Sequence, residues 1–139
     1  MKKVIGVTQY LFVNKEEART IVGEQSDIKS YLRELHKLGA AEVIITDGKN
    51  GSFVFAEDQF FTMGIPDTKV VERTGAGDSF ATAYIAARAE GKKVTEAMCA
   101  GTMNSSSVIM YVGPQEGLLT KKGIAAFHKK TKHSCAKAF

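Results

Sequence analysis

The residues whose types and spacing point most directly to chemistry form the run Thr74-Gly75-Ala76-Gly77-Asp78, ahead of an alanine-rich helical pattern. Glycine adopts positive φ readily, so we expect Gly75 and Gly77 to do so. The N–H groups of Gly75, Ala76 and Gly77 can then converge on an anionic oxygen. The dipole of the helix favours the same charge. Asp78 would lie beside the anion and accept a proton from an attacking hydroxyl, an arrangement suited to phosphoryl transfer.

The same run also has a purely structural interpretation, in which Thr74 or Asp78 caps the helix and the glycines form a tight turn. Two common phosphate-binding motifs are excluded by spacing. The chain has no GxxxxGK followed by Ser or Thr, and Phe80 stands where the dinucleotide fingerprint GxGxxG has its third glycine. The turn is therefore neither of these two motifs.

Residues 70–80, with the sequence VVERTGAGDSF, resemble the DTTGAGDxF signature of the ribokinase-like (PfkB) sugar and nucleoside kinases. Two further segments occur in the order and spacing of that family. Residues 14–18 resemble its NxxE element, and residues 46–51 resemble its TxGxxG element. The three segments together cover residues 10–120, nearly the whole chain.

The resemblance implies a ribokinase-like three-layer α/β fold, of which residues 1–139 would be the C-terminal ATP-binding portion, with a truncated mixed sheet flanked by helices. It implies ATP-dependent phosphoryl transfer to a hydroxyl of a sugar or nucleoside. Asp78 would be the catalytic base, and the backbone at Gly75, Ala76 and Gly77 would form the anion hole. Family members are about twice as long, so the N-terminal acceptor-binding half and its β lid are expected to be absent.

Thr46, Gly48 and Gly51 follow the end of an expected strand, where open α/β sheets bind ligands. Their hydroxyl and amides suit nucleotide phosphates, and the resemblance places them in the ATP site. The alternative is a plain turn leading into a hairpin. In the later helix that resembles the adenine-binding region, Asn104 is the candidate nucleotide contact, although Thr102 lies nearer the register expected for the family's asparagine.

Asn14 and Glu17 lie three residues apart at a strand-to-helix junction, so their side chains can share one side of the helix start. As oxygen ligands they could organise Mg²⁺ through water, and the resemblance implies a Mg²⁺–phosphate role. The alternative is an Asn cap with Glu17 stabilising the helix dipole. Glu72 replaces an aspartate that in many relatives helps to form a monovalent-cation site, which argues against K⁺ activation.

The composition is that of an ordinary globular domain: 139 residues, 44% hydrophobic and 24% charged, with a net charge of +4. The basic excess near the end lacks interleaved aromatic residues, so we expect no nucleic-acid partner. Cys99 and Cys135 are too few and too scattered for a disulfide framework or a zinc site. The three histidines show no metal-ligand spacing and are expected at the surface. No bilayer-spanning run or signal peptide is apparent, and a reducing cytoplasm is expected.

The periodicity predicts an α/β chain with its strands early and its helices late. Strands are expected at 10–13, 42–46 and 69–72, with a hairpin of 52–56 and 59–63. Helices are expected at 15–22, from 28 to a stop at Gly39, and at 78–90, 95–110 and 121–132. An Asp27 cap should begin the second helix.

Two hypotheses of function follow. The first is the kinase, which would bind ATP and a small hydroxyl-bearing substrate and would form a homo-oligomer or associate with the missing N-terminal half. The second is a catalytically inactive nucleotide-binding or assembly module derived from such a kinase, whose exposed sheet edge would pair with another chain.

Overall fold

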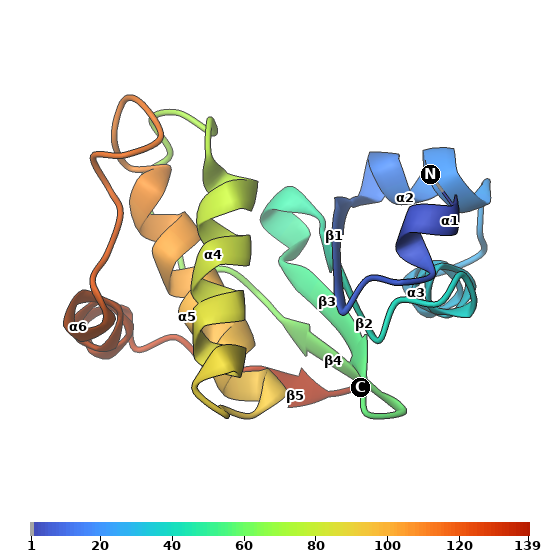
Figure 1. Cartoon of the computed structure of the whole chain (residues 1–139). Coiled ribbons are helices and arrows are strands. Elements are labelled where there is room, and N and C mark those ends of the chain that lie inside the picture. The colour runs from blue at the N-terminus through green and yellow to red at the C-terminus, as the bar shows by residue number, and fades with distance from the viewer. Residues whose placement is uncertain (1) are drawn as a thin grey trace. The chain divides into compact units, whose positions relative to one another are not determined.

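A computed structural model describes residues 2–139, with side chains from Val4 onward. The chain divides into two compact units. The first unit runs to Thr62 and includes Ala138–Phe139, and the second is Met63–Lys137. Figure 1 labels the elements of both units along the chain. Each unit is described below by itself.

The first unit is built around a mixed sheet with strand order β1-β2-β3-β4-β5. Strands β1 and β2 are parallel, whereas β2 and β3 are antiparallel. The strands are β1 Tyr10–Asn14, β2 Glu42–Thr46, β3 Ser52–Ala56, β4 Gln59–Met63 and β5 Lys137–Ala138. The helical elements are α1 Lys2–Ile5, α2 Lys15–Val22, α3 Ile28–Lys37 and the short 3₁₀ helix η1 Gly48–Asn50.

Helices α2 and α3 pack against the parallel and antiparallel strands of this sheet. Strand β2 is central to the packing because Val43, Ile44 and Ile45 are all completely buried. The apolar face of α3 contributes Leu32 and Leu35 to the same core. Strand β2 lies between β1 and β3 in the sheet. Its run of buried β-branched residues is the pattern expected of a strand that is covered on both faces.

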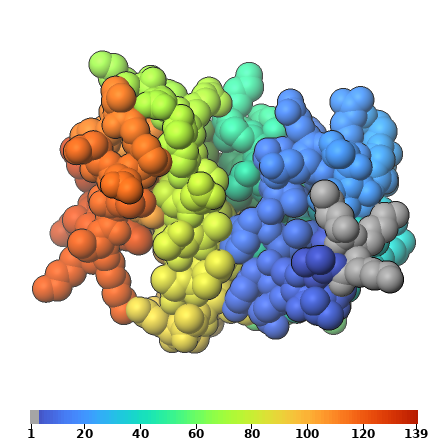
Figure 2. Space-filling view, turned by 45° about the horizontal axis from the view of Figure 1, so that its top comes forward, coloured from blue at the N-terminus to red at the C-terminus, as the bar shows by residue number. Residues whose placement is uncertain are grey.

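The second unit is helical and contains α4 Ala76–Ala89, α5 Val94–Val108 and α6 Lys121–Thr131. Helices α4 and α5 pack closely at Gly101, where an added Cβ would lie 2.9 Å from the Phe80 ring. Among its described residues, α6 has none that is buried. In the space-filling view, α4 in yellow-green lies beside the orange chain that follows α5 (Figure 2).

Most expected elements are confirmed, including α2, the Asp27 cap of α3, β2 and the hairpin of β3 and β4. The strand expected at 69–72 is wrong. The N–H groups of Val71 and Glu72 both donate to Ile109 O, at 2.7 and 3.2 Å, so this segment pairs at a single carbonyl instead of forming a ladder. The sequence pattern also missed α1 and β5, which are only four and two residues long.

Helix α4 begins at Ala76, two residues earlier than expected. Gly77 is therefore helical, and the expectation that it would have positive φ is wrong. Within the described residues, we find no helix that is both long enough and apolar enough to cross a bilayer.

Candidate functional site

The glycine-rich turn places Gly75 at the N-cap of α4. Its backbone is left-handed, with φ +80° and ψ 0°. A Cβ added to Gly75 would lie 2.5 Å from Pro114 Cβ, so both the dihedral angle and the close approach of the neighbouring loop require glycine. No side chain caps this helix start.

The lack of a side-chain cap leaves backbone donors available at the positive end of a 14-residue helix. The Ala76 N–H donates to Arg73 O at 3.3 Å, and the Ser79 N–H donates to Gly75 O at 2.9 Å. In the part of the chain that the structure describes, the N–H groups of Gly75, Gly77 and Asp78 have no hydrogen-bond partner. A Cβ added to Gly77 would meet no atom within 4 Å, so space is open beside these donors.

Asp78 lies in the first turn of α4 and is exposed. Its backbone carbonyl accepts a hydrogen bond from Thr82 Oγ1 at 2.8 Å. Its carboxylate makes no hydrogen bond or ion pair with any residue that the structure describes. The carboxylate is therefore available to a ligand beside the open N–H groups.

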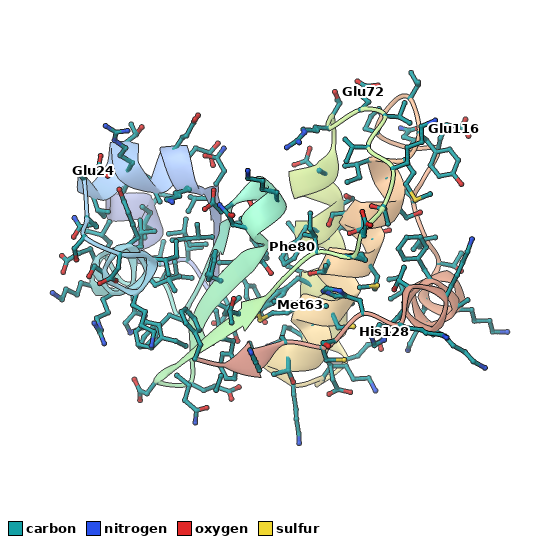
Figure 3. All side chains as sticks on the ribbon, turned by 180° about the vertical axis from the view of Figure 1, so that it is seen from behind. Glu24, Met63, Glu72, Phe80, Glu116 and His128 are labelled. Atoms are coloured by element: carbon teal, nitrogen blue, oxygen red, sulfur yellow. The ribbon has the colours of Figure 1, made fainter. Side chains whose placement is uncertain are left out.

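Glu72, labelled in Figure 3, connects the glycine-rich turn to the loop after α5. Its Oε1 accepts a hydrogen bond from Thr74 Oγ1 at 2.6 Å, and its Oε2 accepts one from the Gly113 N–H at 2.8 Å. These bonds, that from the Thr74 hydroxyl first and that from the Gly113 amide second, hold the pKa of the carboxyl below its ordinary value. Both carboxylate oxygens are thus used to position the turn.

Asn104 connects three segments of the second unit. Its side-chain amide donates to Ser79 O at 2.8 Å, and its Oδ1 accepts from the Leu119 N–H at 2.9 Å. The residue is only 3% exposed. Asn104 therefore fixes the first turn of α4 relative to α5 and to the segment before α6. From the sequence, Asn104 was considered only as a nucleotide contact, and this structural role was not predicted.

In the first unit, Asn14 and Glu17 form a capping box at the start of α2. The Glu17 N–H donates to Asn14 Oδ1 and the Asn14 N–H donates to Glu17 Oε2, both at 2.8 Å. Each side chain uses one oxygen in this way. Glu17 Oε1 stays available to an external ligand in the described structure.

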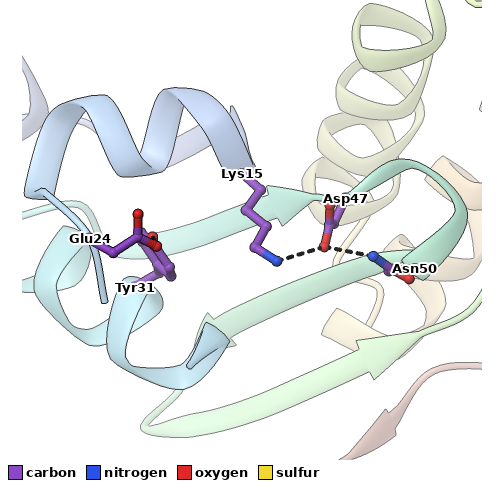
Figure 4. Close-up of polar contacts among 5 residues, drawn as sticks. All are labelled: Lys15, Glu24, Tyr31, Asp47 and Asn50. Atoms are coloured by element: carbon purple, nitrogen blue, oxygen red, sulfur yellow. Dashed lines mark hydrogen bonds and ion pairs between the residues drawn. The ribbon is translucent and has the colours of Figure 1, made fainter. Parts of the chain in front are cut away.

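Thr46 ends β2 in register with Asn14, which ends the parallel strand β1, so the NxxE and TxGxxG elements begin at neighbouring strand ends. Gly48 and Gly51 both have positive φ, at +49° and +89°. The loop closes through a bond from the Asp47 N–H to Gly51 O at 2.8 Å. Asp47 also accepts from Lys15 Nζ at 3.3 Å and from the Asn50 side chain at 3.0 Å (Figure 4).

Cys99 and Cys135 come together with a histidine in the second unit, so the expectation that the two cysteines are scattered is wrong for the folded chain. Cys99 lies on α5, His128 on α6 and Cys135 in the C-terminal segment. Their potential ligand atoms all lie within 4.8 Å of one another. Burial, followed by the proximity of Cys135, raises the pKa of the Cys99 thiol to about 12. Sequence spacing gave little signal, since 35 residues separate the two cysteines.

The candidate residues thus fall into two sets. Asn14, Glu17, Thr46, Gly48 and Gly51 lie in the first unit, at or after the ends of β1 and β2. The second unit holds the glycine-rich turn at 75–78 and Asn104.

Comparison with known proteins shows similarity to a kinase family over most of the chain. Residues 1–121 match the model of the pfkB family of carbohydrate kinases. The cytidine kinase of Thermococcus kodakarensis is 30% identical over 111 residues, which are 78% of this chain and 40% of the relative. The chain therefore spans about 40% of the length of this curated relative.

Two solved structures extend the likeness to the fold. Ribokinase from Thermotoga maritima matches with a TM-score of 0.85 and 25% identity, covering 93% of this chain and 45% of the ribokinase. Arabidopsis thaliana ribokinase, solved with ribose and ATP, matches with a TM-score of 0.85 and 24% identity, covering 93% of this chain and 43% of that enzyme. The chain thus has a ribokinase-like α/β fold over less than half the length of these enzymes.

Proposed function

Since the chain belongs to the pfkB family of carbohydrate kinases, we propose that it carries the ATP-binding and catalytic portion of a sugar or nucleoside kinase. One observation carries this proposal. Within the described residues, the N–H groups of Gly75, Gly77 and Asp78 at the start of α4 are unpaired, and the carboxylate of Asp78 on the same turn makes no hydrogen bond or ion pair. An anion-binding helix start with a neighbouring base is what transfer of a phosphoryl group to an alcohol requires.

In this reaction the hydroxyl of the acceptor attacks the terminal phosphorus of ATP, and the bond from that phosphorus to the bridging oxygen breaks. ADP leaves with the bonding electron pair, and the Asp78 carboxylate takes the hydroxyl proton. The transition state is loose, so positioning and charge stabilisation matter more than the strength of the base. The N–H groups of the α4 turn stabilise the equatorial oxygens of the transferred group.

Further nucleotide contacts are proposed for residues of each unit. The Thr46 hydroxyl and the loop containing Gly48 and Gly51 bind phosphates of ATP, and Asn104 in the second unit retains its candidate role near the base. Oxygen donors such as Asn14 and Glu17 suit Mg²⁺, which keeps several of its waters, so we assign them to hold the hydrated ion. Bound Mg²⁺ would neutralise charge on the phosphates.

The acceptor-binding residues are proposed to come from outside these 139 residues, because the chain spans less than half the length of the relatives it matches. The acceptor itself is a small molecule with a free hydroxyl, of the sugar or nucleoside class. Association with the acceptor-binding half, or with another copy of the chain, would complete the enzyme.

Binding and catalysis can be tested separately. ATP with Mg²⁺ should raise the melting temperature of the chain, measured by thermal denaturation, and ATP at a hundredfold excess over Kd corresponds to about 2.7 kcal/mol of stabilisation. Unchanged melting at millimolar ATP would contradict the proposal.

The catalytic test is Asp78→Asn, assayed as ADP formation with a panel of sugars and nucleosides after the chain is combined with the N-terminal half of a relative. We expect the variant to lose about 10²–10⁴-fold in kcat while the ATP-induced rise in melting temperature is kept. Asp58→Asn is the matched control, since it makes the same chemical change at an exposed hairpin position. ATP binding without transfer in any combination would instead favour the inactive nucleotide-binding module.

A further inference from the structure

We propose that Cys99, His128 and Cys135 form a zinc site that joins α5, α6 and the C-terminal segment. The three residues come from three different segments, all within the second unit. This site is separate from the α4 turn proposed for phosphoryl transfer, and it is independent of that proposal.

The distances between the three side chains fit a tetrahedral ion. Cys99 Sγ lies 3.6 Å from His128 Nδ1 and 4.0 Å from Cys135 Sγ, and Cys135 Sγ lies 3.7 Å from His128 Nε2. Zinc–ligand bonds of about 2.3 Å to sulfur and about 2.1 Å to nitrogen give tetrahedral edges of about 3.8 Å between two sulfurs and about 3.6 Å between sulfur and nitrogen. The separations of Cys99 Sγ from His128 Nδ1 and from Cys135 Sγ lie close to these edges. The contact of Cys135 with the ring is to Nε2, so it is not an edge of a site in which Nδ1 is the ligand, although the potential ligand atoms of the three residues all lie within 4.8 Å of one another.

The histidine is oriented for ligation by its own hydrogen bond. His128 Nε2 lies 2.9 Å from His133 O, and a carbonyl can only accept, so Nε2 carries the proton. The lone pair is then on Nδ1, the nitrogen that lies nearest Cys99. A ligating histidine that donates its other N–H to a main-chain carbonyl is the usual arrangement around bound zinc.

The donor set selects the metal. Two sulfurs and one imidazole nitrogen are ligands that zinc binds well, whereas Mg²⁺ and Ca²⁺ prefer oxygen. The three residues also line a cavity of about 480 Å³ among α4, α5 and α6. A water from this cavity can take the fourth position.

The packing of helix α6 suggests what the bound ion would do for the structure. Helix α6 contributes no fully buried residue among those described, and its apolar side chains Ile124 and Phe127 are half-buried. A metal bound by one residue from α5, one from α6 and one from the following segment would fix α6 in place. Binding energy at such a site becomes stabilisation of the fold.

The test uses the full chain, purified with a phosphine reductant so that both thiols stay reduced, and zinc chloride as the probe. We expect one zinc per chain by elemental analysis and a rise in melting temperature of about 10 °C at a hundredfold excess over Kd, reversed by a chelator. Cobalt(II) in place of zinc should give the visible absorption of a tetrahedral ion and a thiolate-to-cobalt charge-transfer band.

Cys135→Ser is the main variant, because Cys135 is exposed and its substitution leaves the core intact. We expect it to weaken zinc binding more than about 100-fold and to abolish the charge transfer expected from this sulfur. His128→Asn should act similarly. His133→Asn is the matched control, since it keeps the main-chain carbonyl that accepts from His128 while removing a neighbouring imidazole.

Three results would overturn the proposal. They are zinc binding at less than one per chain, equal affinity of the wild type and the Cys135→Ser variant, or equal loss of binding in the His133→Asn control. Formation of a Cys99–Cys135 disulfide in air, detected by mass, together with no cobalt spectrum under reduction, would assign the pair to redox chemistry instead.

Discussion

Helices α2 and α4 both begin at candidate ligand-binding motifs, but their first turns are satisfied in opposite ways. At α2, Asn14 and Glu17 form a reciprocal capping box. At α4, Gly75 occupies the N-cap, and no side chain among the described residues caps the N–H groups of the first turn. One helix start is closed by its own residues, and the other leaves its donors open.

The two helix starts differ in the residue type at a single position, the N-cap. A side-chain oxygen at the cap stabilises the helix but occupies a donor that an anion would need. Glycine gives up that stabilisation and leaves the dipole and N–H groups exposed. The α4 start therefore depends on neighbouring segments, above all on Pro114 and Glu72, to maintain its shape.

The largest effect is expected from Gly75→Ala. The substitution forces an alanine into φ +80° and drives its Cβ to 2.5 Å from Pro114 Cβ. Left-handed strain and steric crowding together should lower the free energy of unfolding by about 2–4 kcal/mol, measured by urea denaturation. ATP-induced stabilisation should be lost as well.

Gly77→Ala is the control for Gly75→Ala, because it makes the same substitution two residues further along the chain. Gly77 is helical, and its added Cβ would meet nothing within 4 Å, so the free energy of unfolding should be unchanged or rise by up to about 1 kcal/mol. A similar destabilisation in both variants would show that the geometry of Gly75 is not what distinguishes this helix start.

Asn14→Ala should break the closed start of α2. Loss of the bond to the Glu17 N–H should cost about 1 kcal/mol of the free energy of unfolding, measured in the same way. Asn14→Asp keeps an oxygen acceptor at the cap and should stay near the wild type. Equal destabilisation by Asp and Ala would argue against capping as the cause.

The smallest effect is expected at Glu72, because the residue is only half-buried and water screens its carboxylate. Its pKa is lowered in the folded state, so its contribution to stability is present above the ordinary glutamate pKa and is lost as the pH falls through the folded value. Glu72→Gln should therefore lower the melting temperature slightly at neutral pH and make little difference at acid pH.

Glu116→Gln is the control for this pH dependence, since Glu116 is exposed on the neighbouring loop and makes no bond to the described residues (Figure 3). A gap between Glu72→Gln and the wild type that stays constant with pH would contradict the assigned role of the carboxylate.

Local elements were largely predictable from residue order. The Asp27 cap, the buried run at 43–45 and the β3–β4 hairpin each depend on interactions between residues close in the chain. The strand expected at 69–72 failed because its partner, Ile109, lies almost forty residues away and offers one carbonyl in place of a ladder. The helical state of Gly77 was missed because glycine runs are compatible with several backbone conformations.

The candidate sites show the same difference between features set by residues close in the chain and features set by residues far apart in it. Residue types and spacing alone identified the motif at 74–78 and its family, because an anion-binding turn and a base can be encoded within five consecutive residues. The availability of particular N–H groups, the connection of Glu72 to Gly113 and the meeting of Cys99 with Cys135 all depend on segments brought together by folding. Spacing along the chain carries no direct measure of such distances, so these features could be established from the folded coordinates and not from residue order.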